Sequence, residues 1–271
     1  MTDYKMPERT QESNKGTFGK VLNLSGCGNY IGAAYLSTVS ALKVGAGFCA
    51  LASNKDVIRS VSALLPEAVY LSRSEALRNI KQYTTFLIGC GLGQERASIK
   101  VFKQFINKLQ KETMPVVIDA DGLNILSRTK IKPPKNSVIT PHPLEAARLL
   151  GVEVDKILSD LEGSAKKLSA KYECVAILKT HRTIICEGEK VFVNQHGNSA
   201  LAKAGSGDVL AGIIAGLLAQ GMPTFEATKL GVYLHSRAGE IASEKLSEYS
   251  VLASDLPKYV SLAIKELITQ N

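Results

Sequence analysis

Short apolar runs rich in β-branched residues alternate along the chain with longer segments in which apolar residues recur at helical spacing. Such alternation is typical of a largely parallel sheet covered by helices on both faces. The strands expected from it are Val21–Leu24, Phe48–Ala52, Thr85–Gly89, Val116–Asp119, Val138–Thr140 and Val175–Lys179. Helices are expected near Ala33–Val44, Ala97–Leu109, Pro143–Leu150 and Gly163–Lys171.

The last third of the chain has a different pattern. Two short apolar runs, Thr183–Glu187 and Val191–Asn194, are separated by a glycine and predict a hairpin. The helices expected after it are Asp208–Ala219, Thr224–Lys245 with breaks, and Ala253–Thr269. No proline- or serine-rich linker divides the sequence, so we expect a single domain over residues 1–271, with residues 1–15 leading into it. The predicted fold is an α/β three-layer sandwich with helices on both faces of a mostly parallel sheet.

The chain carries a formal net charge of +8. Its basic residues are scattered rather than gathered into a stripe with aromatic residues, so a solvated basic surface is favoured over nucleic-acid binding. Such a surface also suits small polyanionic substrates. The five cysteines form no CxxC pair and stand mostly in apolar runs, which predicts reduced, buried thiols.

The start of the chain is too polar for a signal peptide, since Asp3, Glu8 and Glu12 fall within it. No segment offers the roughly 18 uninterrupted apolar residues that a transmembrane helix needs. We therefore expect a cytoplasmic protein without membrane association.

Unusual residues cluster where the expected strands end. In open α/β sheets, ligands bind beyond the carboxyl ends of the strands. Five of the expected strands are followed by glycine-rich or polar segments, namely Gly26–Gly28, Gly89–Gly93, Asp119–Asp121, Thr140–Glu145 and Lys179–Thr183. We expect these five loops to converge on one crevice.

A further segment, Gly205–Asp208, consists of small residues followed at once by an apolar helix. Free amides and the positive end of a helix dipole make such a place an anion site. Asp208 has two interpretations, a helix N-cap or a base beside bound phosphates. The glycines within the following helix favour the functional interpretation.

The two other glycine clusters are less specific. Gly26–Gly32 resembles a dinucleotide fingerprint, but its third glycine comes one residue too late. Gly89–Gly93 fits a tight strand-to-helix turn as well as it fits a ligand contact.

Carboxylates at two strand ends suggest polar chemistry. Asp119 and Asp121 close an apolar strand, where an unpaired carboxylate is costly, so a polar site is favoured over a structural cap, with Asn124 nearby. His142 and Glu145 stand three residues apart. One histidine and one glutamate make a poor zinc site, whereas a glutamate holding the waters of a phosphate-bound Mg²⁺ is more plausible.

The ordered series of motifs resembles the ADP- or ATP-dependent NAD(P)H-hydrate dehydratases of the ribokinase-like superfamily. The resemblance spans about residues 13 to 265 and implies a ribokinase-like fold. The matching segments are Asn14–Gly19, Tyr30–Ala34, Lys43–Gly47, Leu64–Glu67, Gly89–Gly93, Asp119–Asn124, Thr140–Glu145 and Gly205–Asp208.

The resemblance implies repair of (6S)-hydrated NADH and NADPH, so that NAD(P)H is a product. ADP or ATP would donate a phosphoryl group to the 6-hydroxyl, and phosphate would then leave. Asp208 would be the catalytic base. The substrate-binding residues would be Ala33, Gly91, His142 and Asp208. The nucleotide-binding residues would be Lys179, Thr180, His181, Arg182, Thr183, Gly205, Ser206 and Gly207, with Glu145 organising Mg²⁺.

Two positions depart from the family pattern, because the family usually has glycine at Thr180 and often Thr or Met at Ser206. Thr180 makes the geometry of the adenylate loop and the nucleotide affinity less certain. Bifunctional relatives carry an additional epimerase domain, so we expect a stand-alone dehydratase served by a separate epimerase. The resemblance also leans towards ADP as donor and towards a homotetramer.

Two other functions compete with this interpretation. A small-alcohol kinase of the same superfamily, of the hydroxyethylthiazole or hydroxymethylpyrimidine type, would share Gly205–Asp208 and keep its phosphorylated product. A nucleotide-sensing or scaffold protein on the same fold would need no catalytic base.

Overall fold

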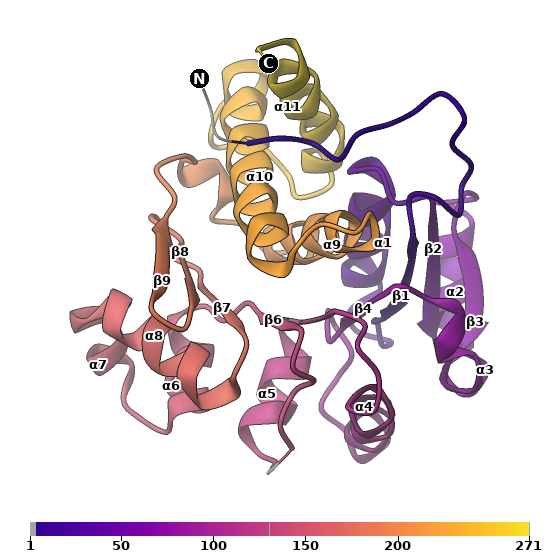
Figure 1. Cartoon of the computed structure of the whole chain (residues 1–271), viewed down its shortest axis with the longest axis horizontal. Helices are drawn as coiled ribbons and strands as arrows, with labels where there is room; N and C mark the ends of the chain where they lie inside the picture. The colour runs from indigo at the N-terminus through magenta and orange to yellow at the C-terminus, as the bar shows by residue number, and fades with distance from the viewer. Residues whose placement is uncertain (1–3, 130, 271) are drawn as a thin grey trace.

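The computed structural model describes residues 4–129 and 131–270, and within them a single mixed sheet runs through the middle of the molecule (Figure 1). Its strands lie in the order β3-β2-β1-β4-β5-β6-β7-β8-β9. Neighbours from β3 to β7 are parallel, and β8 and β9 are antiparallel. The strands are β1 Lys20–Leu24, β2 Phe48–Ser53, β3 Val69–Ser72, β4 Thr85–Ile88, β5 Val116–Ile118, β6 Ser137–Ile139, β7 Val175–Leu178, β8 Ile184–Glu187 and β9 Lys190–Val193.

Helices cover both faces of this sheet, so the predicted three-layer α/β fold is confirmed. Helices α1, α9, α10 and α11 lie on one face, and α4, α5, α6 and α8 on the other (Figure 1). The helices are α1 Ile31–Lys43, α2 Lys55–Ser62, α3 Arg73–Arg78, α4 Arg96–Leu109, α5 Asp121–Ser127, α6 Pro143–Leu150, α7 Val154–Ser159, α8 Leu161–Tyr172, α9 Ser206–Ala219, α10 Thr224–Leu246 and α11 Leu256–Gln270.

The central strands are apolar throughout because both of their faces are buried. In β4, Leu87 belongs to the apolar cluster beneath α9, whereas Phe86 and Ile88 belong to the cluster beneath α4. All three side chains are fully buried. Buried parallel strands therefore appear in the sequence as continuous apolar runs rather than as alternating ones.

The structure corrects some of the expected elements. Strand β3 and the short helices α2, α3, α5 and α7 were not among those expected. Strand β3 lies at the edge of the sheet and is partly exposed, so it lacks the apolar run that marks the central strands. The breaks expected within Thr224–Lys245 are wrong, because α10 is continuous to Leu246.

The five cysteines are free and buried, as expected. The described part of the expected lead-in is irregular up to β1 and is anchored on α10, where Tyr4 stacks on Tyr233 with ring centroids 4.2 Å apart. Residues 1–3 of that lead-in lie outside the described residues. No helix in the described ranges has the length and hydropathy for crossing a bilayer.

Glycines within α9 allow that helix to lie against α1. A side chain at Gly212 would collide with the carbonyl of Ser37, and a side chain at Gly216 would come within 2.6 Å of the carbonyl of Ala41. These two glycines are thus explained by helix packing. The expectation that these glycines indicate a function for Asp208 is therefore not supported.

Gly212→Ala should destabilise the protein by about 1–3 kcal/mol, because the added methyl group overpacks the contact between α9 and α1. Denaturation in urea, followed by circular dichroism, measures the change. Gly32→Ala in α1 is a matched control, since no atom lies within 4 Å of the added methyl group. Equal stability of the two variants would contradict the packing argument.

Candidate active site

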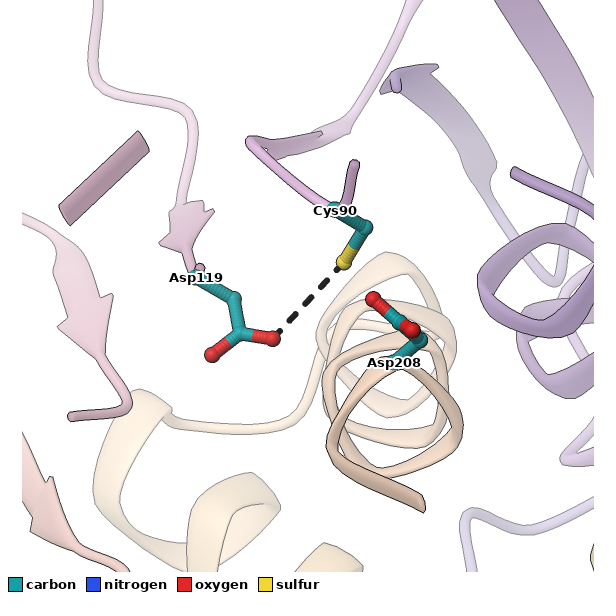
Figure 2. A group of neighbouring side chains, drawn as sticks. All are labelled: Cys90, Asp119 and Asp208. Atoms are coloured by element: carbon teal, nitrogen blue, oxygen red, sulfur yellow. Dashed lines mark hydrogen bonds between the residues drawn. The ribbon is translucent and has the colours of Figure 1, made fainter. Parts of the chain in front are cut away.

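Five loops at the carboxyl edge of the sheet are joined by hydrogen bonds around Asp119. Its Oδ1 accepts hydrogen bonds from Lys179 Nζ at 2.8 Å and from Thr140 Oγ1 at 2.5 Å. Its Oδ2 lies 3.8 Å from the Cys90 thiol (Figure 2). The Cys90 carbonyl in turn accepts the Gly26 N–H at 2.9 Å. The loops after β1, β4, β5, β6 and β7 therefore meet at one place.

Asp119 is a buried charge with a dedicated counter-ion. Only 1% of the residue is exposed, and a carboxylate so buried needs a cation or donors. Burial alone would lower the pKa of Lys179, but Asp119 and Glu145 raise it above its ordinary value, so the ammonium keeps its charge. About 20% of the Lys179 side chain is exposed. It can therefore meet a ligand while it neutralises Asp119.

Asp208 is the third residue of α9 and points towards Cys90 and Asp119 (Figure 2). Burial raises the pKa of its carboxyl to about 7, and the charge of Asp119 adds to the shift. Burial also keeps the pKa of the Cys90 thiol well above its ordinary value, with both aspartates adding to that shift. The site therefore holds one carboxylate paired with lysine and a second that titrates near neutral pH.

The N-cap interpretation of Asp208 is wrong. The residue at the N-cap of α9 is Gly205, and no side chain caps this end. Gly205 has a φ of 92°, and a side chain there would come within 2.9 Å of Ala253. A side chain at Gly207 would lie 3.3 Å from Lys179 Nζ, so the first turn of α9 passes directly beside that ammonium.

The Ser206 hydroxyl forms a hydrogen bond within the protein. The residue is 4% exposed, and its Oγ lies 3.0 Å from Nε2 of His235 on α10. Burial lowers the pKa of His235 to about 4, so the imidazole is neutral at physiological pH. The sequence did not reveal this contact, because a single histidine within a helix gives no indication of its partner.

His142 and Glu145 form a capping box at the start of α6. The Glu145 carboxylate accepts the His142 N–H at 2.9 Å, while Nδ1 of His142 accepts the Leu144 N–H at 3.2 Å and the Glu145 N–H at 3.4 Å. Burial raises the pKa of Glu145 to about 7, although Lys179 opposes the shift. Burial lowers the pKa of His142, with Lys179 contributing.

Two sets of side chains at the site could face a divalent cation. Cys90, Asp119 and Asp208 present ligand atoms within 4.8 Å of one another. However, a thiol is too soft a ligand for Mg²⁺, and Asp119 is already neutralised by Lys179. Glu145 fits better, because a desolvated carboxylate gains from a nearby cation and Mg²⁺ needs few protein ligands when phosphates and water supply the rest.

The predicted adenylate loop, Lys179–Thr183, is closed by its own side chains. Thr180 Oγ1 donates to the Arg182 carbonyl at 2.8 Å, and Thr183 Oγ1 donates to the Thr180 carbonyl at 3.2 Å. His181 and Arg182 are exposed. Thr180 is not among the residues with positive φ, so its backbone does not require glycine.

The predicted substrate residues Ala33 and Gly91 adjoin each other. Gly91 has a φ of 57°, and a side chain there would lie 2.9 Å from the Ala33 methyl group and 2.5 Å from Tyr30 Cβ. Tyr30 itself is 56% exposed at the rim of this loop. The structure thus places the loop after β1 directly against the loop after β4.

Asp121 braces the site and does not line it. Its two oxygens accept the Gly93 N–H at 2.9 Å and the Gln94 amide at 2.8 Å. Ala120 between the two aspartates has a φ of 49°, a costly conformation for alanine, and the aspartates on either side of it have different partners. Asn124 likewise serves a structural contact, with Arg148 at 2.8 Å. The expected polar site at this strand end therefore depends on Asp119 alone.

A cavity of about 320 Å³ lies elsewhere, beyond the amino ends of β6 and β7. Lys135, Ser137, Cys174 and Glu187 are among its lining residues. None of the loops joined around Asp119 reaches it.

The sheet order, the helix start beside Lys179 and the neighbouring Asp119 and Asp208 define a ribokinase-like α/β protein. The family model described as NAD(P)H-hydrate dehydratase matches residues 21–262. The chain belongs to this family, as its motifs indicated.

Curated relatives and solved structures agree with this assignment. The ADP-dependent (S)-NAD(P)H-hydrate dehydratase of Neisseria meningitidis is 38% identical over 87% of this chain and 81% of its own length. The Bacillus subtilis enzyme of the same name is 33% identical over 93% of this chain and 91% of its own. The ADP/ATP-dependent enzyme from B. subtilis, co-crystallised with ATP and Mg²⁺, superposes with a TM-score of 0.87 and 32% identity, covering 96% and 94% of the two chains.

A kinase also shares the architecture. A hydroxyethylthiazole kinase from Pyrococcus horikoshii superposes with a TM-score of 0.67 over 91% of this chain and 89% of its own, at 15% identity. Similarity at that level shows the fold alone.

Asp208→Asn should make the protein more stable at alkaline pH. Folding raises the carboxyl pKa from 3.8 to about 7, so the folded state favours the protonated form. The contribution of this protonated carboxyl to stability is complete below about pH 4 and is lost as the pH rises from there through 7. We expect the variant to exceed the parent by about 1–4 kcal/mol at pH 8, with no gap near pH 4.

Urea denaturation across this pH range measures the difference. Asp155→Asn, on the exposed surface of α7, is the matched control and should change little at any pH. A constant gap between parent and Asp208→Asn from pH 4 to 8 would contradict the raised pKa.

Proposed function

We propose that this protein is an ADP- or ATP-dependent (S)-NAD(P)H-hydrate dehydratase, which returns (6S)-hydrated NADH and NADPH to NADH and NADPH. AMP or ADP and phosphate would be the other products. The observation that carries the proposal is the partly buried Asp208, with a pKa of about 7, in the first turn of α9 beside Lys179, in a chain of this family. Relatives named for this activity match 87% to 95% of the chain.

The chemistry requires a better leaving group than hydroxide. Asp208 takes the proton of the 6-hydroxyl while the hydroxyl oxygen bonds to the terminal phosphorus of the nucleotide. The bond between that phosphorus and the departing AMP or ADP breaks. The ring nitrogen then expels phosphate from C6. Loss of a proton from the adjacent ring carbon restores the double bond. No electrons are exchanged with a redox partner in these steps.

The start of α9 suits the phosphoryl group in transfer. The positive end of the helix dipole at Gly205–Gly207 favours negative charge, and Lys179 adds a full positive charge beside Gly207. When bound, Mg²⁺ would neutralise phosphate charge, and Glu145 would hold its water shell. We assign the adenylate to Lys179–Thr183 and the hydrated ring to Ala33, Gly91, His142 and Asp208.

The proposal extends to a partner enzyme, a compartment and an oligomeric state. Bifunctional NAD(P)H-hydrate repair enzymes, such as that of Moorella thermoacetica, match 97% of this chain over 52% of their own length. We propose that a separate epimerase supplies the S epimer to this chain, that the protein is cytoplasmic and that it forms a homotetramer. ADP is the favoured donor, in keeping with the names of the curated stand-alone relatives.

Incubation with hydrated NADH, Mg²⁺ and either ADP or ATP should restore the absorbance of NADH, with AMP or ADP formed in equal amount. Omission of the nucleotide should abolish the recovery. A small-alcohol kinase would instead phosphorylate hydroxyethylthiazole or hydroxymethylpyrimidine and leave the hydrate unchanged. No recovery with either nucleotide would refute the dehydratase assignment.

Asp208→Asn should lower kcat by about 10²–10⁴-fold while nucleotide binding is largely retained, because the base is lost and the anion site stays. In the parent protein, kcat/KM should rise with pH through about 7, since only the ionised carboxyl accepts a proton.

Glu145→Gln is the control for the pH profile, because Glu145 also has a pKa of about 7. The rise should persist in that variant even if its rate is lower. Disappearance of the rise in Glu145→Gln alone would transfer the titration from Asp208 to Glu145.

A further inference from the structure

Arg73 is a half-buried cation at the carboxyl edge of the sheet that forms no ion pair with the described residues. It is the first residue of α3 and comes directly after β3. Its Nη2 donates to the Gly26 carbonyl at 2.8 Å. Its Nε is buried without a partner, and the guanidinium forms no ion pair with any residue in the described ranges. Burial lowers the pKa of Arg73, and the Glu95 carboxylate opposes the shift from beyond ion-pair distance; an arginine remains charged in a protein.

The carbonyl that Arg73 contacts belongs to a loop of the proposed substrate side. Gly26 also donates its N–H to the Cys90 carbonyl, and Cys90 lies beside Asp208. The Ser53 hydroxyl lies 3.2 Å from the same Gly26 carbonyl. No atom of the described chain lies within 4 Å of where a side chain at Gly28 would begin. The loop is therefore held at Gly26 by these hydrogen bonds and is open at Gly28.

The order of the strands determines which way a long substrate must extend. The proposed nucleotide residues follow β7 and start α9, whereas the proposed substrate residues Ala33 and Gly91 lie on the loops after β1 and β4. With Asp208 between the two ligands, the rest of the substrate has to extend away from β7. From β4, the next strands in that direction are β1, β2 and β3. Strand β3, which Arg73 follows, lies roughly 14 Å from β4 at three strand spacings, and the Arg73 side chain reaches back to the loop after β1.

We propose that Arg73 binds a phosphate of the dinucleotide substrate on the far side of the Gly26–Gly28 loop. This inference rests on the proposed function, since it takes the substrate to be a hydrated dinucleotide. A guanidinium offers several donors in a planar fork suited to phosphate. The Gly26 carbonyl engages one nitrogen, which orients the group. The unpaired charge would then be compensated by the ligand.

The test is steady-state kinetics of Arg73→Met with hydrated NADH and hydrated NADPH as separate substrates. The KM for the dinucleotide should rise about 10- to 100-fold, the usual loss for a charge-assisted hydrogen bond. Both kcat and the KM for ADP should stay within about twofold of the parent, because the contact is remote from the transferred phosphoryl group. A raised KM for both substrates would identify the pyrophosphate as the group that Arg73 binds. A raised KM for hydrated NADPH alone would identify the 2′-phosphate.

Arg78→Met is the matched control, because Arg78 is an exposed arginine at the other end of the same helix. It should leave all parameters unchanged. Arg73→Lys keeps the charge without the fork, so an intermediate KM is expected. That variant decides the question if Arg73→Met melts at a lower temperature or fails to fold.

Unchanged KM values for both dinucleotides in Arg73→Lys and Arg73→Met would overturn the proposal. A joint loss of kcat and of ADP affinity would also overturn it, since Arg73 would then only support the loop. Failure of the parent protein to restore NADH would instead refute the proposed function, and the two failures are thus distinguishable.

Discussion

The ion pair between Asp119 and Lys179 is the interaction on which the site depends. It joins the loop after β5 to the loop after β7 across a 2.8 Å contact, in a place where Asp119 is almost wholly buried. Removal of one partner of a buried pair leaves the other charge uncompensated, which is costly. Because α9 begins directly beside Lys179, the pair also sets where the proposed phosphoryl site lies relative to the sheet.

The same pair divides the work between two aspartates. Asp119 is paired with Lys179. Asp208 forms no ion pair within the described ranges and lies in the field of Asp119, and burial and that field together raise its pKa to about 7. Two neighbouring acids in different environments can serve different roles. Asp119 holds the Lys179 ammonium, and Asp208 is the proposed base.

Much of the fold could be predicted because the buried central strands are marked by unbroken apolar runs. Strand β3 escaped prediction since an edge strand with partly exposed residues has no such run. The convergence of the loops followed from a general property of parallel sheets. Contacts between distant residues could not be predicted in this way. Asp119 and Lys179 are 60 residues apart, and Ser206 and His235 are 29 apart.

The glycines show why composition alone misleads. Gly205 and Gly207 lie at the proposed site, one with a positive φ and the other beside Lys179. Gly212 and Gly216, a few residues further along the same helix, allow the contact with α1. The four belong to one glycine-rich segment of sequence. Only their neighbours in the structure distinguish the two glycines at the proposed site from the two that allow helix packing.

The raised pKa of Asp208 also limits how the nucleotide can be bound. A polyphosphate approaching the start of α9 brings negative charge close to Asp208, which by itself would raise the carboxyl pKa further and make it a poorer base. Positive charge must therefore accompany the phosphates. Lys179 supplies part of it, although that ammonium already serves Asp119. Glu145 lies close enough to Lys179 to affect its pKa and has a carboxyl that a cation would ionise. A nucleotide that arrives with its divalent cation would therefore return Asp208 to its basic form at neutral pH.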